Sequence, residues 1–131
     1  MTAQNDFHSL NICVLTVSDT RTFANDTSGD KLKTLLEEAG HKLHDRKLIK
    51  DDVYQMRAVV STWIADNKAQ VVLITGGTGF AGRDSTPEAI HPLLDKTIEG
   101  FGELFRQLSY DDIGTSTIQS RAFAGLANRT L

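Results

Sequence analysis

Apolar residues in this chain form short continuous runs that alternate with stretches in which they recur every three or four positions. The runs cover residues 10–17, 41–49 and 71–74 and predict three strands, of which the second is mixed in polarity and suits a sheet edge. Two amphipathic helices are predicted between them. One has Leu32, Leu35, Leu36 and Ala39 on a single buried face and ends at Gly40, and the other has Val53, Met56, Val59, Val60, Trp63 and Ile64. This alternation predicts an α/β fold with a parallel sheet and right-handed crossovers.

The part of the chain beyond the third strand is less regular. A short helix is predicted from Pro87 to Leu94, and a longer one is indicated by Phe101, Leu104, Phe105 and Leu108 at helical spacing. Residues 116–127 are rich in small and helix-compatible side chains. Thr130 and Leu131 look like the beginning of another strand, so we expect the natural protein to continue beyond them.

Composition narrows the class of protein. The 131 residues, of which 40% are hydrophobic and 24% charged, suit one globular domain that spans residues 1–131. The formal net charge of −3 supplies no basic field for nucleic acid or an anionic membrane, and no segment has the ~20 apolar residues that cross a bilayer. The single cysteine, Cys13, lies in an apolar run and is expected to be a buried structural thiol. We therefore expect a cytoplasmic protein whose partners include neither nucleic acid nor a membrane.

The most informative stretch is residues 71–89, where a strand leads into a glycine-rich loop and then a helix start. The strand is expected to be buried on both faces, and glycines follow it at positions 76, 77, 79 and 82. Ser85 and Thr86 offer cap oxygens, and Pro87 suits the first helical turn. Such a loop turns main-chain N–H groups toward an anion. A long turn without a ligand is the alternative, and the loop matches neither the dinucleotide fingerprint nor the P-loop.

Three polar segments are expected to converge at the carboxyl ends of the strands, where open parallel sheets bind ligands. They are Ser18-Asp19, Asp51-Asp52 and the glycine loop. We expect the N–H groups of Gly76, Gly77, Thr78 and Gly79 to hold phosphate oxygens, with hydroxyl donors from Ser18, Thr75 or Thr78. Asp51 and Asp84 are expected to coordinate Mg²⁺ beside these phosphates, while Arg83 stabilises negative charge. This chemistry suits phosphoryl or nucleotidyl transfer.

Simpler interpretations exist for two of these residues. Asp51 also suits a plain helix cap, and Arg83 a surface or inter-subunit ion pair. Other enzyme classes lack support, because the four histidines show no metal-ligand spacing and no G-x-S-x-G motif occurs. An aromatic content of 7% without interleaved basic residues argues against a platform for single-stranded nucleic acid.

Two adjacent motifs resemble a known signature. Leu73-Ile-Thr-Gly-Gly-Thr-Gly79, followed by Arg83-Asp-Ser-Thr-Pro-Glu-Ala89, is similar to that of the MoaB/Mog family of molybdenum-cofactor biosynthesis proteins, the MoaB branch above all. Further matches lie along nearly the whole chain, at Thr16-Val-Ser-Asp19, Asp26-Thr-Ser-Gly29, Glu99-Gly-Phe-Gly-Glu103, Gly114-Thr-Ser and Ser120-Arg121.

The resemblance implies a three-layer α/β/α sandwich around a mainly parallel sheet, assembled as homotrimers or as hexamers of two trimers. It implies binding of molybdopterin and, in active members, adenylyltransferase activity that joins the molybdopterin phosphate to AMP from Mg·ATP and releases pyrophosphate. By position, the two family carboxylates fall on Asp51 and Asp84. The phosphate loop falls on residues 76–79, with Arg83 and Ser85 in the matched motif and Ser18 and Asp19 lining the neighbouring pocket.

Three positions depart from the family pattern. Gly82 stands where proline commonly precedes the Arg-Asp pair, Ser85 where valine is frequent, and Lys50 where proline often precedes the first carboxylate. The family also continues with a strand and a Pro-Gly loop that this chain is expected to lack. The leading hypothesis is a molybdopterin adenylyltransferase that uses Mg²⁺ and ATP. The alternatives are a non-catalytic module that binds and delivers molybdopterin, and a protein that serves assembly alone.

Overall fold

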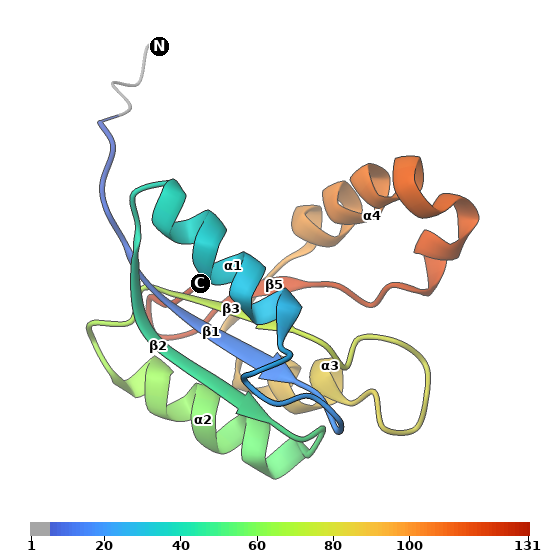
Figure 1. The fold of residues 1–131 in the computed structure, drawn as a ribbon, viewed down its shortest axis with the longest axis horizontal. Coiled ribbons are helices and arrows are strands. Elements are labelled where there is room, and N and C mark those ends of the chain that lie inside the picture. The colour runs from blue at the N-terminus through green and yellow to red at the C-terminus, as the bar shows by residue number, and fades with distance from the viewer. Residues whose placement is uncertain (1–5) are drawn as a thin grey trace.

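The computed structural model describes residues 6–131 and is built around a three-stranded parallel sheet (Figure 1). The strands are β1 (Asn11–Val17), β2 (Lys42–Ile49) and β3 (Val71–Thr75), and they lie in the order β2-β1-β3. The parallel sheet and the edge position of β2 are therefore as predicted. Strand β1 occupies the centre, and six of its seven residues are buried.

Helices cover both faces of the sheet, which confirms the predicted three layers. On one face, α1 (Thr27–Glu38) packs Leu36 against Ile12 and Val14. On the other face, α2 (Val53–Ala65) packs its stripe against the alternate residues of β1. The buried members of this larger core are Cys13, Leu15, Val17, Met56, Val60, Trp63, Ala69, Ala89 and Ile90. Cys13 is fully buried as expected, and burial together with the nearby Asp45 charge raises its pKa to about 11.

Two expectations about burial are wrong. Leu35 of α1 and Ala39, the residue that caps its C-terminus, are exposed, so the predicted buried face of this helix is narrower and centred on Leu36. Strand β3 is only half-buried along its whole length, although complete burial was expected from its apolar run. The reason is that β1 covers one edge of β3, while the opposite side opens into an apolar pocket.

Side-chain caps fix where the first two helices begin. Asp26 caps α1 by accepting a hydrogen bond from the Gly29 N–H, which places Gly29 in the helix and not in the preceding loop. Asp52 caps α2 by accepting from the Gln55 N–H at 2.9 Å. The cap of α2 is therefore Asp52, and Asp51 is free for another role.

The second half of the chain forms a small antiparallel unit with a long helical excursion. Helix α3 (Thr86–Ile90) is followed by a 3₁₀ turn, η1 (His91–Leu93), and by β4 (Lys96–Ile98). The excursion comprises α4 (Glu99–Ile113) and a second 3₁₀ segment, η2 (Gly114–Gln119). The chain then returns as β5 (Ala124–Leu126), which pairs with β4. Residues 116–127, which looked helix-compatible, thus form a 3₁₀ end and a strand instead.

Helix α4 was predicted correctly, but it projects away from the sheet (Figure 1). Its apolar residues Phe101, Leu104, Phe105 and Leu108 are between 44% and 63% exposed. The amphipathic pattern therefore marks a helix whose apolar face has no partner among residues 6–131.

The last residue lies along the outer edge of β3. The Leu131 N–H donates to the Gln70 carbonyl at 3.0 Å, and the Val72 N–H donates to the Leu131 carbonyl at 2.8 Å. Thr130 and Leu131 are not assigned to a strand, yet their backbone continues the sheet as the sequence suggested.

Among the described helices, none has both the length and the apolar character needed to cross a membrane.

Candidate functional site

The loops that follow β1, β2 and β3 meet at the carboxyl edge of the sheet, and Asp19 connects them. Its Oδ1 accepts the Asp51 N–H at 3.1 Å from the loop after β2. The same carboxylate accepts two hydrogen bonds from Arg83 of the glycine loop, at 2.8 and 3.0 Å. Three segments that are far apart in sequence are thereby joined through one side chain.

Every carbonyl oxygen from Gly76 to Gly79 accepts a hydrogen bond from another part of the protein. Thr86 holds the first two, through its hydroxyl to Gly76 at 2.8 Å and its N–H to Gly77 at 3.0 Å. Arg121 holds the other two, through its N–H to Thr78 at 3.2 Å and its Nε to Gly79 at 2.8 Å. Carbonyls fixed in this way orient the peptide planes of the whole loop.

The N–H groups on the opposite side of these peptides are free. In a trans peptide the N–H points away from the carbonyl of the preceding residue, and the described chain has no cis bonds. The N–H groups of residues 77–80 accordingly point away from Thr86 and Arg121, and they donate to no residue within 6–131. Consecutive free amides of this kind form an anion-binding concavity.

Two of the glycines are required by the backbone. Gly76 has φ +103° and Gly77 has φ +71°, which other residues rarely adopt. A side chain at Gly76 would also collide with the Val17 carbonyl, and one at Gly77 would approach the Asp51 carboxylate to 2.9 Å. The close approach at Gly77 places Asp51 directly beside the loop.

Asp51 is buried and is held by the start of α3. Its Oδ1 accepts the Ser85 N–H at 3.3 Å and also the Ser85 hydroxyl. Its Oδ2 faces Gly77 and receives no hydrogen bond from the described residues. One oxygen of this carboxylate is therefore fixed and the other is available.

Asp84 lies beside the same loop, three residues after Ala81. Its Oδ2 accepts the Ala81 N–H at 3.0 Å, and a side chain built at Gly79 would approach this oxygen to 2.7 Å. Its Oδ1 has no donor within the described part of the chain. The two aspartates thus flank the glycine loop, Asp51 near Gly77 and Asp84 near Gly79, and each keeps one free oxygen.

The pair formed by Arg83 and Asp19 shifts the titration of both residues. The Arg83 hydrogen bonds, followed by the Asp51 N–H, lower the pKa of Asp19 to about 2. The Asp19 carboxylate in turn raises the pKa of Arg83. Arg83 therefore forms an ion pair within its own chain, in which its side chain stays largely exposed.

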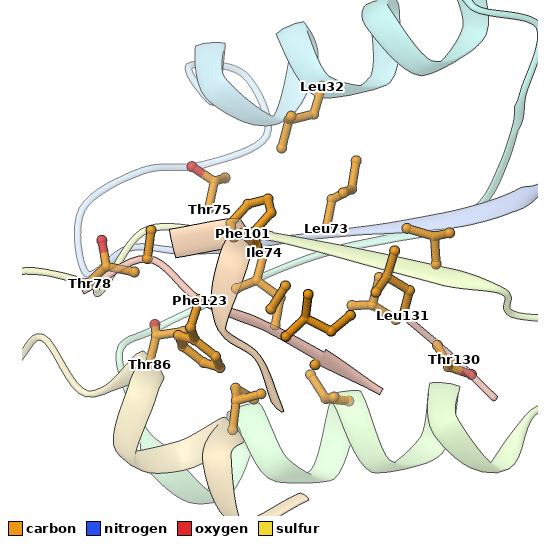
Figure 2. Close-up of a pocket in the computed structure, with 18 of the residues that line it drawn as sticks. Leu32, Leu73, Ile74, Thr75, Thr78, Thr86, Phe101, Phe123, Thr130 and Leu131 are labelled. Atoms are coloured by element: carbon orange, nitrogen blue, oxygen red, sulfur yellow. The ribbon is translucent and has the colours of Figure 1, made fainter. Parts of the chain in front are cut away.

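The hydroxyls predicted as phosphate donors take different positions. Ser18 Oγ accepts the N–H groups of Thr20 and Arg21 and so shapes the turn after β1. Thr75 and Thr78 lie on the wall of an apolar pocket of about 730 Å³, between α1, β3 and the excursion (Figure 2). None of Ser18, Asp19, Asp51 or Asp84 lines this pocket. The loop therefore separates two environments, one apolar and one that carries the carboxylates.

Residues 6–131 contain no cluster of three or more His, Cys, Asp or Glu side chains arranged to hold a metal ion. A cation at this edge would have two candidate carboxylates, Asp51 and Asp84.

Sequence reasoning missed the part of Arg121, which follows the central loop by many residues. The signal that marked it was its place in the Ser120-Arg121 match.

Comparison with known proteins gives a consistent result. The family model described as "Probable molybdopterin binding domain" matches residues 13–129. "Molybdenum cofactor biosynthesis protein B" of Escherichia coli K12 is 53% identical over 126 residues, which cover 96% of this chain and 74% of the relative. The protein of the same name from Bacillus subtilis is 48% identical over 118 residues, covering 89% and 69%.

Solved structures agree with the sequence matches. A crystal structure of molybdenum cofactor biosynthesis protein B superposes with a TM-score of 0.90 at 45% identity, covering 94% of this chain and 77% of the other. The tungsten cofactor synthesizing protein MoaB from Pyrococcus furiosus superposes with a TM-score of 0.82 at 35% identity, covering 93% and 76%. The chain thus belongs to the MoaB branch of the molybdopterin-binding domain family, whose members serve molybdenum-cofactor biosynthesis.

Proposed function

We propose that this chain catalyses the Mg·ATP-dependent adenylylation of molybdopterin. An oxygen of the molybdopterin phosphate attacks the α-phosphorus of ATP, the bond from that phosphorus to the bridging oxygen breaks, and pyrophosphate leaves. The observation that carries the proposal is the run of free N–H groups at residues 77–80 between two carboxylates that each retain a free oxygen. Phosphoryl-type transfer depends on positioning and charge neutralisation, which such groups supply.

The residues take distinct roles in this proposal. In the glycine loop, the free amides of residues 77–80 bind phosphate oxygens and Gly76 supplies the turn before them, while Ser18, Thr75 and Thr78 line the ligand on either side of the loop. Arg83 supplies positive charge for the polyphosphate, for which it must exchange its bonds to Asp19. Ser85 orients Asp51.

The donor set of Asp51 and Asp84 fits Mg²⁺. This ion prefers oxygen ligands and is commonly held by one or two carboxylates together with substrate phosphates and water. Asp51 Oδ2 and Asp84 Oδ1 are the oxygens available to it. When bound, the ion would neutralise charge on ATP and on the departing pyrophosphate.

A second candidate is a non-catalytic module that binds and delivers molybdopterin. The observation in its favour is the engagement of Asp51 by both the N–H and the hydroxyl of Ser85, which commits part of this carboxylate to the protein itself. Such a module uses the free amides for the pterin phosphate and needs no nucleotide.

We also propose that the chain assembles as a trimer or as a hexamer of two trimers in the cytoplasm. The unpartnered apolar face of α4 supports assembly, because exposed apolar patches on a helix mark interaction sites.

The test is to incubate the protein with molybdopterin, ATP and Mg²⁺ and to measure pyrophosphate. We expect release that depends on all three components and that falls roughly 100-fold in Asp84→Ala, the size of effect seen when a charge-stabilising group is lost. Asp112→Ala is the matched control, since Asp112 is an exposed aspartate on α4. Equal release by wild type and Asp84→Ala contradicts catalysis at this site. Molybdopterin binding without turnover would support the delivery module, and titration without nucleotide measures that binding.

A further inference from the structure

Arg121 makes contacts that no other side chain of the candidate site makes. It reaches the glycine loop from the extended segment between η2 and β5, 37 residues beyond Asp84 in sequence. Its Nε donates to the Gly79 carbonyl at 2.8 Å, and its Nη2 donates to the Asp84 carbonyl at 2.6 Å. Its own N–H donates to the Thr78 carbonyl at 3.2 Å. Three carbonyls on either side of the Phe80–Arg83 tip are thus fixed by one residue.

The orientation of the loop amides follows from these contacts. The Thr78 carbonyl belongs to the same peptide plane as the Gly79 N–H, and the Gly79 carbonyl to that of the Phe80 N–H. Fixing the two carbonyls therefore turns the last two free N–H groups toward the opposite side. Fixing the Asp84 carbonyl sets the backbone from which the Asp84 carboxylate projects.

The guanidinium is itself held in place from two directions. Its Nη1 lies 2.6 Å from the Glu88 carboxylate on α3, and its carbon lies 5.5 Å from the centre of the Phe80 ring. Arg106 of α4 donates to the carbonyls of Ser120 and Ala122, the two neighbours of Arg121, at 3.2 Å each. The side chain is about one-quarter exposed, so its bonds to carbonyls are partly protected from water.

We propose that Arg121 is the positioning residue of the glycine loop, which holds the Gly79 and Phe80 amides and Asp84 in the arrangement that receives an oxyanion. The inference rests on the proposed function, since it assigns the loop as the oxyanion site. A guanidinium is required because its planar fork reaches two carbonyls and a carboxylate at once. A lysine at this position keeps the charge beside Glu88 but cannot span the same acceptors.

Arg57 provides a matched control within the same chain. It lies on α2, and its Nε and Nη2 donate to the carbonyls of Ala89 and Glu88 at 3.0 and 3.1 Å. It is therefore another arginine that binds two carbonyls, but both belong to α3 and neither belongs to the glycine loop. Arg121→Lys removes guanidinium-to-carbonyl hydrogen bonds from the glycine loop, and Arg57→Lys removes the same type of bond from α3.

The experiment compares amide hydrogen exchange across the chain in wild type, Arg121→Lys and Arg57→Lys, together with calorimetric titration of inorganic pyrophosphate. We expect Arg121→Lys to raise exchange at least about tenfold at the two hydrogen-bonded amides of the loop, those of Ala81 and Asp84, and to weaken pyrophosphate binding by a similar factor. Arg57→Lys should change neither, while both variants lose comparable thermal stability.

Exchange at the Ala81 and Asp84 amides that is the same in Arg121→Lys and in wild type overturns the inference. An increase spread evenly over the chain, and equal in both variants, also overturns it, because it assigns Arg121 only a general stabilising role. The exchange comparison does not depend on turnover. Wild-type protein that fails to release pyrophosphate from Mg·ATP therefore defeats the proposed activity and leaves the decision on Arg121 to the exchange data.

Discussion

Asp19 and Arg83 are joined by two parallel hydrogen bonds, from Arg83 Nη2 and Nε to the two oxygens of the Asp19 carboxylate. Asp19 belongs to the loop after the central strand, so it lies between the loop that carries Asp51 and the loop that carries Asp84. Its Oδ1 also accepts the Asp51 N–H. The arrangement makes Asp19 the point at which the two candidate metal-binding aspartates are connected.

The ion pair between Asp19 and Arg83 should persist in mild acid. Asp19 has a pKa lowered from 3.8 to about 2, so its contribution to stability is fully present above about pH 4 and is lost as the pH falls through about 2. Carboxyl-carbon NMR titration of Asp19 should give a midpoint near 2. In Arg83→Met the midpoint should move back toward 3.8, because the Arg83 hydrogen bonds are the largest cause of the lowered Asp19 pKa and this variant removes them. An Asp19 midpoint that is the same in both proteins would contradict the described pair.

Ser85→Val should weaken metal-dependent activity. The Ser85 hydroxyl donates to Asp51 Oδ1 and orients the carboxylate, and a hydrogen bond to a charged group contributes about 1.5–3 kcal/mol, so its removal should weaken Mg²⁺ binding at least about tenfold. The hydroxyl makes no side-chain cap bond to α3, so this helix should not lose stability through the change. The measurement is the Mg²⁺ dependence of pyrophosphate release, with Asp51→Asn as the variant expected to abolish it. Tighter Mg²⁺ binding in Ser85→Val than in wild type would contradict the orienting role of the hydroxyl.

Gly77→Ala and Gly82→Ala should have opposite effects on stability. Gly77 has positive φ and a crowded surrounding, and strained backbone of this kind costs about 1–3 kcal/mol. Gly82 lies in the same loop, has no positive φ and would place its new methyl group in open space, so alanine there should stabilise by about 0.4–1 kcal/mol. Urea unfolding of both variants checks the contrast. Similar changes in the two would show that the loop tolerates side chains equally at both positions.

Asp26→Asn should destabilise the fold by about 3 kcal/mol, the loss expected when a buried charge loses its partner. Asp26 is fully buried and accepts from Thr16 at 2.7 Å and from Arg46 at 3.0 Å. Burial alone raises its pKa, but the bonds from Thr16, Gly29 and Arg46 outweigh burial and hold the pKa below its ordinary value. Asparagine keeps the helix cap but removes the charge.

Asp30→Asn is the control for this prediction. Asp30 binds the same guanidinium at 2.9 Å, but its side chain is 58% exposed, so its loss should cost less than about 1 kcal/mol. Chemical unfolding at neutral pH compares the two variants. Equal losses would mean that burial does not strengthen the pair of Asp26 and Arg46.

Charges on the apolar face of α4 should prevent assembly. Leu104→Glu combined with Leu108→Glu places two carboxylates among side chains that are exposed in the single chain, so the monomer should keep its fold while the oligomer dissociates. Analytical ultracentrifugation measures the mass, and circular dichroism the fold. Tyr54→Glu is the control, because Tyr54 is 77% exposed on α2. A double variant with the mass of wild type would exclude this face as the interface.

The sequence indicated the sheet and the first two helices because the apolar pattern of each element is visible within its own residues. It could not decide between Asp51 and Asp52 as the cap of α2, since both occupy suitable positions. That choice depends on Ser85, which reaches Asp51 only after folding. Strands β4 and β5 escaped prediction because they are short and β4 is exposed throughout, so neither shows an alternating pattern.

The glycine loop itself was evident, but what orients it was not. Composition predicts a flexible stretch suited to anion binding, whereas the direction of its amides depends on hydrogen bonds that Thr86 and Arg121 donate to its carbonyls. Arg121 lies beyond an entire helical excursion, and no local pattern relates it to Gly79. The exposure of β3 was misjudged for a similar reason, because it depends on which segment covers the strand and not on its own residues.

The projecting helix and the glycine loop share a mechanical link, since Arg106 holds the backbone on either side of Arg121. A binding partner that pulled α4 outward would withdraw both arginines together and release the carbonyls that they hold. Occupancy of the loop by a ligand would, by thermodynamic reciprocity, resist that movement and alter the partner's affinity to the same degree. Ligand binding at the glycine loop and partner binding at α4 would then be coupled through one conformational equilibrium.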